Sequence, residues 1–120
     1  MKEVYDFFCA ASVCFLAVCA GSQPHLYPFE SFFLHQGRLY FRTGRAEAVT
    51  RQLHLNPRLE LCAMLEDGRV SVEGSAVLDN DRVVRSALLS GDDDAELWYL
   101  RNCTLTRFSL DEPPMSRRIV

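Results

Sequence analysis

Apolar and polar residues alternate along most of the chain, and the period of the alternation changes at a few places. A period of two residues predicts strands with one buried face, and a period of three to four predicts helices. The sequence thus predicts six strands, at 13–19, 23–35, 38–42, 59–65, 69–78 and 97–108. Short helices are expected near the N-terminus, over 47–55 and over 79–89. Six strands joined mostly by hairpins favour a closed or split antiparallel barrel over a doubly wound sheet.

The stretch Gly37–Ala63 predicts a strand, a short helix and a second strand. Thr43-Gly44 interrupts the alternation of the first strand, and Asn56-Pro57 ends the helix because proline disfavours helical dihedral angles in the residue before it. A strand that runs through Thr-Gly into a helix leaves free backbone N–H groups at the helix start. Such a turn is a generic place to hold a phosphate, although it also occurs as a plain strand-to-helix connection.

Several residues limit how the strands can pair. Pro24 and Pro28 each lack a ladder donor, so part of their strand is expected at a sheet edge or a bulge. Asp67-Gly68 predicts a tight hairpin turn, and Gly74 predicts a bend or bulge. In the last strand, strict alternation places Trp98, Leu100, Asn102, Thr104 and Thr106 on one face, and Leu97, Tyr99, Arg101, Cys103, Leu105 and Arg107 on the other. Residues 110–120 have no period and are expected to form a loose C-terminal tail.

The apolar segment Phe7–Gly21 resembles a secretory signal, but it is too short to span a bilayer as a helix. Glu3 and Asp6 outweigh Lys2 ahead of it, whereas a signal sequence begins with positive charge. The spacing of its first apolar residues predicts a helix face, and a buried strand follows from Val13. We therefore interpret the segment as a helix and a strand of a mature cytoplasmic chain with no membrane partner.

Composition narrows the function classes. The chain has 120 residues, 48% of them hydrophobic, which is enough for one domain with a core. Its net charge of −3 gives no basic surplus, so no nucleic acid partner is expected. Five cysteines without C-x-x-C spacing predict reduced core thiols, and three scattered histidines predict no metal site. No general acid, general base or nucleophile stands out.

Five segments of the sequence resemble those of the FMN-binding split-barrel family related to pyridoxamine 5′-phosphate oxidase. They are QPHLYPFE, GRLYFRTG, the helix ending in Asn56-Pro57, RLELCAML and VSVEGSAVLDNDR. The resemblance covers residues 1–109, leaving 110–120 as the tail. It implies a mainly β (α+β) fold, a six-stranded antiparallel split β-barrel with about three short helices. It also implies a homodimer with FMN at the subunit interface and the FMN phosphate near the start of the central helix.

The candidate cofactor-binding residues combine local pattern and resemblance. Thr43, Gly44 and Arg45 form a possible phosphate cradle of backbone N–H groups, a hydroxyl and a guanidinium, and Arg42 lies beside it. Tyr27 and Pro28 could form a flavin-side wall, or simply pack at a sheet edge. Arg69 stands where relatives place a side chain that touches the flavin ring, although an arginine beside a hairpin turn is ordinarily a surface residue.

Three hypotheses follow. The first is a homodimeric FMN-dependent oxidoreductase, in which a bound flavin carries the chemistry. The second and third are a split barrel that has lost FMN and binds another ligand, and a purely structural dimer. Tyr27 and Glu47 favour these alternatives, because relatives often have arginine at the first position and basic residues near the second. A dimer is expected because the strands carry large apolar side chains, at Phe32, Phe33, Leu97, Trp98 and Tyr99.

Overall fold

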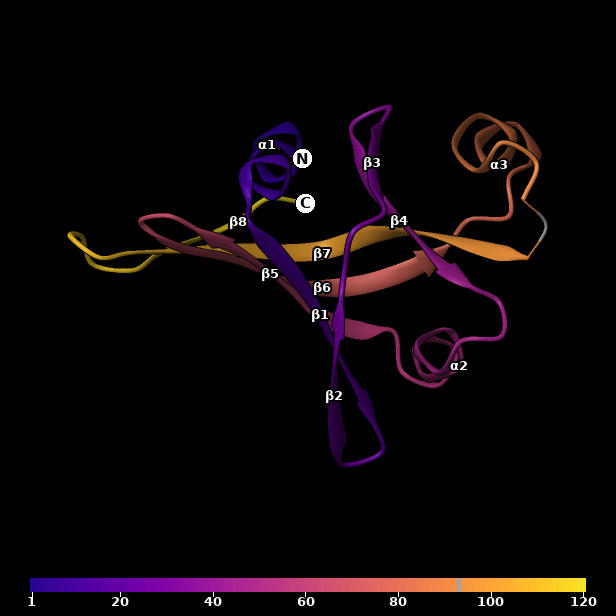
Figure 1. The fold of residues 1–120 in the computed structure, drawn as a ribbon, viewed down its shortest axis with the longest axis horizontal. Helices are drawn as coiled ribbons and strands as arrows, with labels where there is room; N and C mark the ends of the chain where they lie inside the picture. Colours follow the sequence, from indigo (N-terminus) through magenta and orange to yellow (C-terminus); the bar gives the residue numbers. More distant parts are fainter. Residues whose placement is uncertain (93) are drawn as a thin grey trace.

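One antiparallel sheet runs through the whole chain (Figure 1). The computed structural model describes residues 1–92 and 94–120, and over these residues it has eight strands and three helices. The strands are β1 (Val13–Ala20), β2 (Gln23–Pro28), β3 (Phe32–His35), β4 (Arg38–Gly44), β5 (Arg58–Leu65), β6 (Gly68–Leu78), β7 (Ala95–Ser109) and β8 (Met115–Arg118). The helices are α1 (Lys2–Ala10), α2 (Ala48–Leu55) and α3 (Arg82–Leu89). The sheet order is β2-β1-β5-β6-β7-β4-β3, and β8 pairs with β7.

The predicted count of six strands is wrong for two reasons. The segment 23–35 is two strands, β2 and β3, because the three residues between them leave the sheet. The segment expected as a loose tail also contains a strand, since β8 pairs with residues 104–107 of β7. All four residues of β8 are exposed. The strand therefore lacks the alternation of apolar and polar residues from which it could have been predicted.

The two ends of the open sheet are joined by Phe29–Ser31. These residues connect β2 and β3, which lie at opposite ends of the strand order although they are successive in the chain. The Phe29 N–H donates to the Cys14 carbonyl of β1 at 3.0 Å, and the Arg42 N–H of β4 donates to the Ser31 carbonyl at 3.3 Å. The sheet thus curls until its edges meet across a three-residue bridge, and β2, with Pro24 and Pro28, is an edge strand as predicted.

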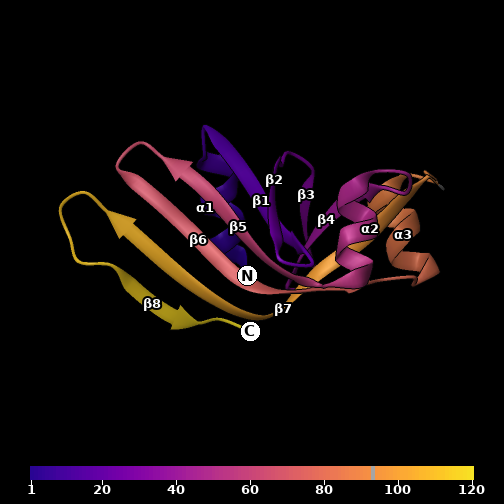
Figure 2. The ribbon, with the colours of Figure 1, turned by 90° about the horizontal axis from the view of Figure 1, so that it is seen from below.

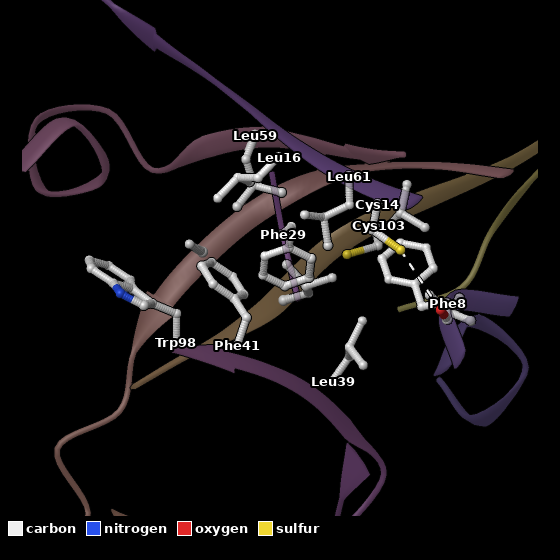
Figure 3. Close-up of a cluster of buried hydrophobic side chains, with 14 of the residues drawn as sticks. Phe8, Cys14, Leu16, Phe29, Leu39, Phe41, Leu59, Leu61, Trp98 and Cys103 are labelled. Atoms are coloured by element: carbon white, nitrogen blue, oxygen red, sulfur yellow. Dashed lines mark hydrogen bonds between the residues drawn. The ribbon is translucent and has the colours of Figure 1, made fainter. Parts of the chain in front are cut away.

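The main core fills the curled sheet around Phe29. Figure 3 shows the Phe29 ring between Leu16 and Leu61 on one side and Phe41 on the other. The ring centroids of Phe29 and Phe41 lie 5.4 Å apart in an edge-on arrangement, which is favourable for aromatic pairs. Helix α1 adds Val4 and Phe8 to this core, and α3 packs on the other face of β4 and β7, against Tyr40 and Leu97.

A bulge in β7 reverses its predicted alternation. Glu73 pairs with Thr104 but Ser75 pairs with Arg101, so Gly74 faces two residues of β7, Asn102 and Cys103. Asn102 has a φ of 56°, a left-handed conformation that asparagine tolerates. A Cβ at Gly74 would lie 2.6 Å from the Cys103 sulfur, so only glycine fits. Cys103 and Leu105 consequently join Trp98 and Leu100 in the core, contrary to the strict alternation.

The N-terminal segment forms a helix and a strand, as predicted. Val4, Phe8, Cys14, Leu16 and Val18 are all buried in the main core. Within the described residues, no helix is long and apolar enough to cross a membrane. All five cysteines of the sequence lie within the described residues and are free thiols, and two of them, Cys14 and Cys103, are buried. Burial raises the pKa of the Cys103 thiol to about 11, so it stays protonated near neutral pH.

Most local predictions are confirmed. The hairpin of β5 and β6 turns at Asp67-Gly68, and α2 ends at Leu55, where Asn56 takes an extended conformation before Pro57. Of the two aspartates considered as caps for the third helix, Asp81 has this role, and its carboxylate accepts from the N–H groups of Val83 and Val84.

We predict that Phe29→Ala lowers the free energy of unfolding by about 3–5 kcal/mol, because it leaves a cavity where the sheet edges meet. Urea denaturation would measure this loss. Leu26→Ala is the matched control, since Leu26 is 63% exposed on neighbouring β2 and should change stability by no more than about 0.5 kcal/mol. Equal effects of the two substitutions would contradict the role given to Phe29.

Candidate functional site

A cavity of about 410 Å³ lies where the sheet edges meet, beside the start of α2. Its walls come from β2, the Phe29–Ser31 bridge, β4 and α2. Four of the predicted cofactor-binding residues line it, namely Tyr27, Pro28, Arg42 and Thr43. The same fold feature that joins the sheet edges therefore also forms the cavity.

Gly44 and Arg45 line a neighbouring cavity, which shares Glu47 with the first. Six of the seven predicted residues thus gather around the start of α2. Arg69 does not join them within one chain. It lies beside the β5–β6 turn, its guanidinium 3.9 Å from the Phe108 ring centroid, and Figures 1 and 2 show that turn at the far end of the sheet from α2.

The Thr43 hydroxyl points into the protein interior. It accepts a hydrogen bond from the Trp98 indole N–H at 2.9 Å and lies 2.6 Å from the Thr50 hydroxyl. The Thr50 hydroxyl also donates to the Gly44 carbonyl at 2.6 Å. This network fastens the start of α2 to β4 and β7. Thr43 therefore positions the turn, and its hydroxyl is already engaged with protein partners.

Two other predicted residues are held by partners far away in the sequence. The Arg42 guanidinium donates to the Asp92 carboxylate at 2.6 Å, so its charge is largely balanced. The Tyr27 hydroxyl donates to the Gln52 side-chain carbonyl of α2 at 2.7 Å. These contacts hold β2, β4 and α2 in place around the cavity. Neither Asp92 nor Gln52 was among the predicted residues, and no local pattern marks them.

Glu47 occupies the turn at the start of α2. It is the N-cap residue of the helix, yet its side chain accepts from the Gly44 N–H at 2.6 Å instead of from its own helix. The Glu47 N–H in turn donates to the Gly44 carbonyl at 3.0 Å. A Cβ at Gly44 would lie 2.5 Å from the Glu47 carboxylate oxygen, so glycine makes room for this contact. The positive end of the α2 dipole also favours the carboxylate.

The chemistry available in this region is that of guanidinium groups, backbone N–H groups and an apolar wall. Arg45 and Arg51 are exposed near Glu47, Arg51 lying one turn further along α2. Within residues 1–92 and 94–120, no group of three or more His, Cys, Asp or Glu side chains is placed to hold a metal ion.

Comparisons with known proteins give matches of structure alone. No protein-family model and no curated protein matches the sequence. A NimC/NimA family protein from Clostridium acetobutylicum has a TM-score of 0.89 and 24% identity, over 99% of this chain and 92% of that one. A protein related to general stress protein 26, of the pyridoxinephosphate oxidase family, from the same organism has a TM-score of 0.73 and 12% identity, over 98% and 93%. A heme binding protein from Mycobacterium smegmatis has a TM-score of 0.77 and 16% identity, over 98% and 57%.

The chain has the split-barrel fold of the pyridoxamine 5′-phosphate oxidase-like proteins. These neighbours fit the family that the sequence segments resemble. Because each is less than 25% identical to this chain, the likeness concerns the fold, and what each neighbour binds is a property of that neighbour. The ligand of this split barrel must be argued from its own residues.

We predict that Thr43→Val destabilises the protein by about 1–3 kcal/mol, because it leaves the buried Trp98 N–H without its acceptor. Urea unfolding followed by the fluorescence of Trp98, the single tryptophan, would measure the loss. Thr104→Val is the control, since Thr104 lies on the same strand as Trp98 and its side chain has no hydrogen bond to the described residues. A Thr43→Val protein as stable as the control would argue against the network.

Proposed function

We propose that the chain is a homodimeric flavin-binding split-barrel protein that takes FMN and acts as a pyridoxamine 5′-phosphate oxidase-like oxidoreductase. The observation that carries the proposal is the cavity at the junction of the sheet edges, around which Tyr27, Pro28, Arg42 and Thr43 gather next to the start of α2. A bound flavin would supply hydride or electron transfer, and the chain would supply its position.

The apolar part of the cavity suits a flat ring. Pro28, Phe29, Leu16 and Val49 give apolar surface, and the Tyr27 hydroxyl is fixed by Gln52, so that its ring has one orientation. The volume of about 410 Å³ falls in the range of small-molecule sites. These features support binding of an aromatic ligand.

The phosphate end fits less well. Arg42, Arg45 and Arg51 bring guanidinium groups to the region, and such groups bind phosphate strongly. However, Asp92 balances Arg42, and the Glu47 carboxylate holds the Gly44 N–H. FMN with its phosphate at this turn would require Glu47 to move away.

A second copy would cover an apolar surface on β1 and β5. Val13 and Met64 are cross-strand neighbours and are 41% and 36% exposed, and Phe15 pairs beside Cys62 on the same face. Arg69 is the cross-strand neighbour of Met64 on β6, so its predicted contribution to the site depends on this second copy. The residues expected to drive dimerisation are a weaker argument, because Leu97 and Trp98 are buried within a single chain.

The proposal also includes a cytoplasmic location and a small-molecule ligand. Five free thiols, two of them buried, suit the reducing cytoplasm. The net charge of −3 supports a small-molecule ligand over a nucleic acid partner.

The hydrogen bond from Gly44 to Glu47 favours one alternative function. In that alternative, the split barrel has lost FMN and serves as a binding module for a different ligand, or as a structural dimer. The carboxylate then completes the turn permanently, and no phosphate enters.

We predict that the purified protein, mixed with FMN and desalted, keeps about one flavin per chain by visible absorbance. Arg45→Ala should lower the affinity about tenfold, because one charge-assisted contact to phosphate is lost. Arg82→Ala is the control, since Arg82 is exposed on α3, away from the cavity. No retained flavin on a folded, dimeric protein would rule out the FMN proposal and favour the alternative function.

We predict a dimer at micromolar concentration by light scattering after size-exclusion chromatography. Met64→Glu should shift it to the monomer and abolish flavin retention, because it places a charge in the proposed interface. Leu110→Glu, at an 81% exposed position outside the strands, should remain dimeric. A monomeric wild-type protein would rule out the dimer.

A further inference from the structure

We propose that the Glu47 carboxylate occupies the position in which a ligand phosphate would meet the start of α2, and that the site, although it takes FMN as proposed above, therefore binds unphosphorylated flavin more tightly than FMN. The inference rests on the proposed flavin site and names its specificity-determining residue. The ligand class that it favours is a flavin that ends in hydroxyl groups, such as riboflavin.

The first step of the argument is that the carboxylate takes the place of an anion. A phosphate at the start of a helix is held by backbone N–H groups and by the helix dipole. Glu47 uses both, since its carboxylate lies 2.6 Å from the Gly44 nitrogen and next to the first turn of α2. Gly44 lacks the Cβ that would exclude this contact. The protein thus supplies its own anion at this turn.

The second step is that the side chains lining this cavity do not offset a further dianion. Arg42, the arginine that lines the cavity, is paired with Asp92 at 2.6 Å. Glu30 also lines the cavity and adds another carboxylate. A phosphate in this space would face like charge and would compete with Glu47 for the same N–H.

The third step is that a hydroxyl-terminated ligand meets no such conflict. A carboxylate has two oxygens and can accept several hydrogen bonds, so Glu47 can keep the Gly44 N–H and accept from a ligand hydroxyl as well. The same carboxylate therefore repels one end group and binds the other.

The test compares FMN with riboflavin by fluorescence titration on the full chain. Glu47→Gln keeps the size of the side chain and its acceptor oxygen but removes the charge. We expect this substitution to raise the FMN affinity at least tenfold and to change the riboflavin affinity less than threefold. Glu112→Gln is the matched control, because it removes a carboxylate from an exposed position outside the strands and outside the cavity, and its effect on FMN should be under threefold. Wild-type protein that binds FMN as tightly as riboflavin or more tightly, or a Glu47→Gln protein whose FMN affinity rises less than tenfold, would overturn the inference.

A second measurement does not depend on flavin. Inorganic phosphate is titrated into ¹⁵N-labelled protein, and the amide resonances of Gly44 and Arg45 are followed. We expect them to shift in Glu47→Gln and to stay in place in the wild type. An equal response in both proteins would overturn the inference. If the phosphate result is as expected but neither flavin binds either protein, the flavin proposal fails while the role of Glu47 as an internal anion stands.

Discussion

The architecture depends on one connection, the three residues Phe29–Ser31 that join the opposite edges of the sheet. The strands that it joins, β2 and β3, lie at opposite ends of the strand order, and nothing else in the chain order links them directly. Two backbone hydrogen bonds, to Cys14 and from Arg42, tie the edges together, and the Phe29 ring fills the space between them. The bridge is too short to complete the ladder. The remaining opening, walled by Tyr27 and Thr43, is the candidate site.

Local signals in the sequence were sufficient for much of this fold. Asp67-Gly68 and Asn56-Pro57 act on dihedral angles of adjacent residues, so the hairpin and the helix end could be predicted from them. The course of β8 could not, because an exposed strand has no apolar face and its pairing with β7 is a contact between distant segments. Strict alternation also failed beyond Asn102, since the bulge arises from the fit between Gly74 and two residues of the facing strand.

The candidate site likewise has features that could be predicted from the sequence and features that could not. The position of Thr43-Gly44 at a helix start is a local property, and it was predictable. The direction of the Thr43 side chain was not, because it depends on Trp98, which lies 55 residues further along the chain. The partners of Arg42 and Tyr27 are likewise distant in sequence. The fold itself does not decide the ligand, since neighbours with this fold include a protein of the pyridoxinephosphate oxidase family and a heme binding protein. In our proposal, individual charges at the helix start, above all Glu47, make that choice.

The bulge at Asn102 limits how this chain can change in length. Successive residues of a strand point to opposite faces, so deleting one residue between Asn102 and Ser109 would turn the rest of β7 inside out. Deletion of Thr104, for example, would move Leu105 to the outer face and bring the polar Thr106 into the core. Deletion or insertion of two residues would keep each later side chain on its own face of the sheet. Deletion of a single residue would be tolerated only if it removed the bulge and a larger residue at Gly74 filled the space. In related chains, the length of β7 should therefore differ by an even number of residues. Where it differs by one residue, the bulge at Asn102 should be absent and a larger residue should stand in place of Gly74.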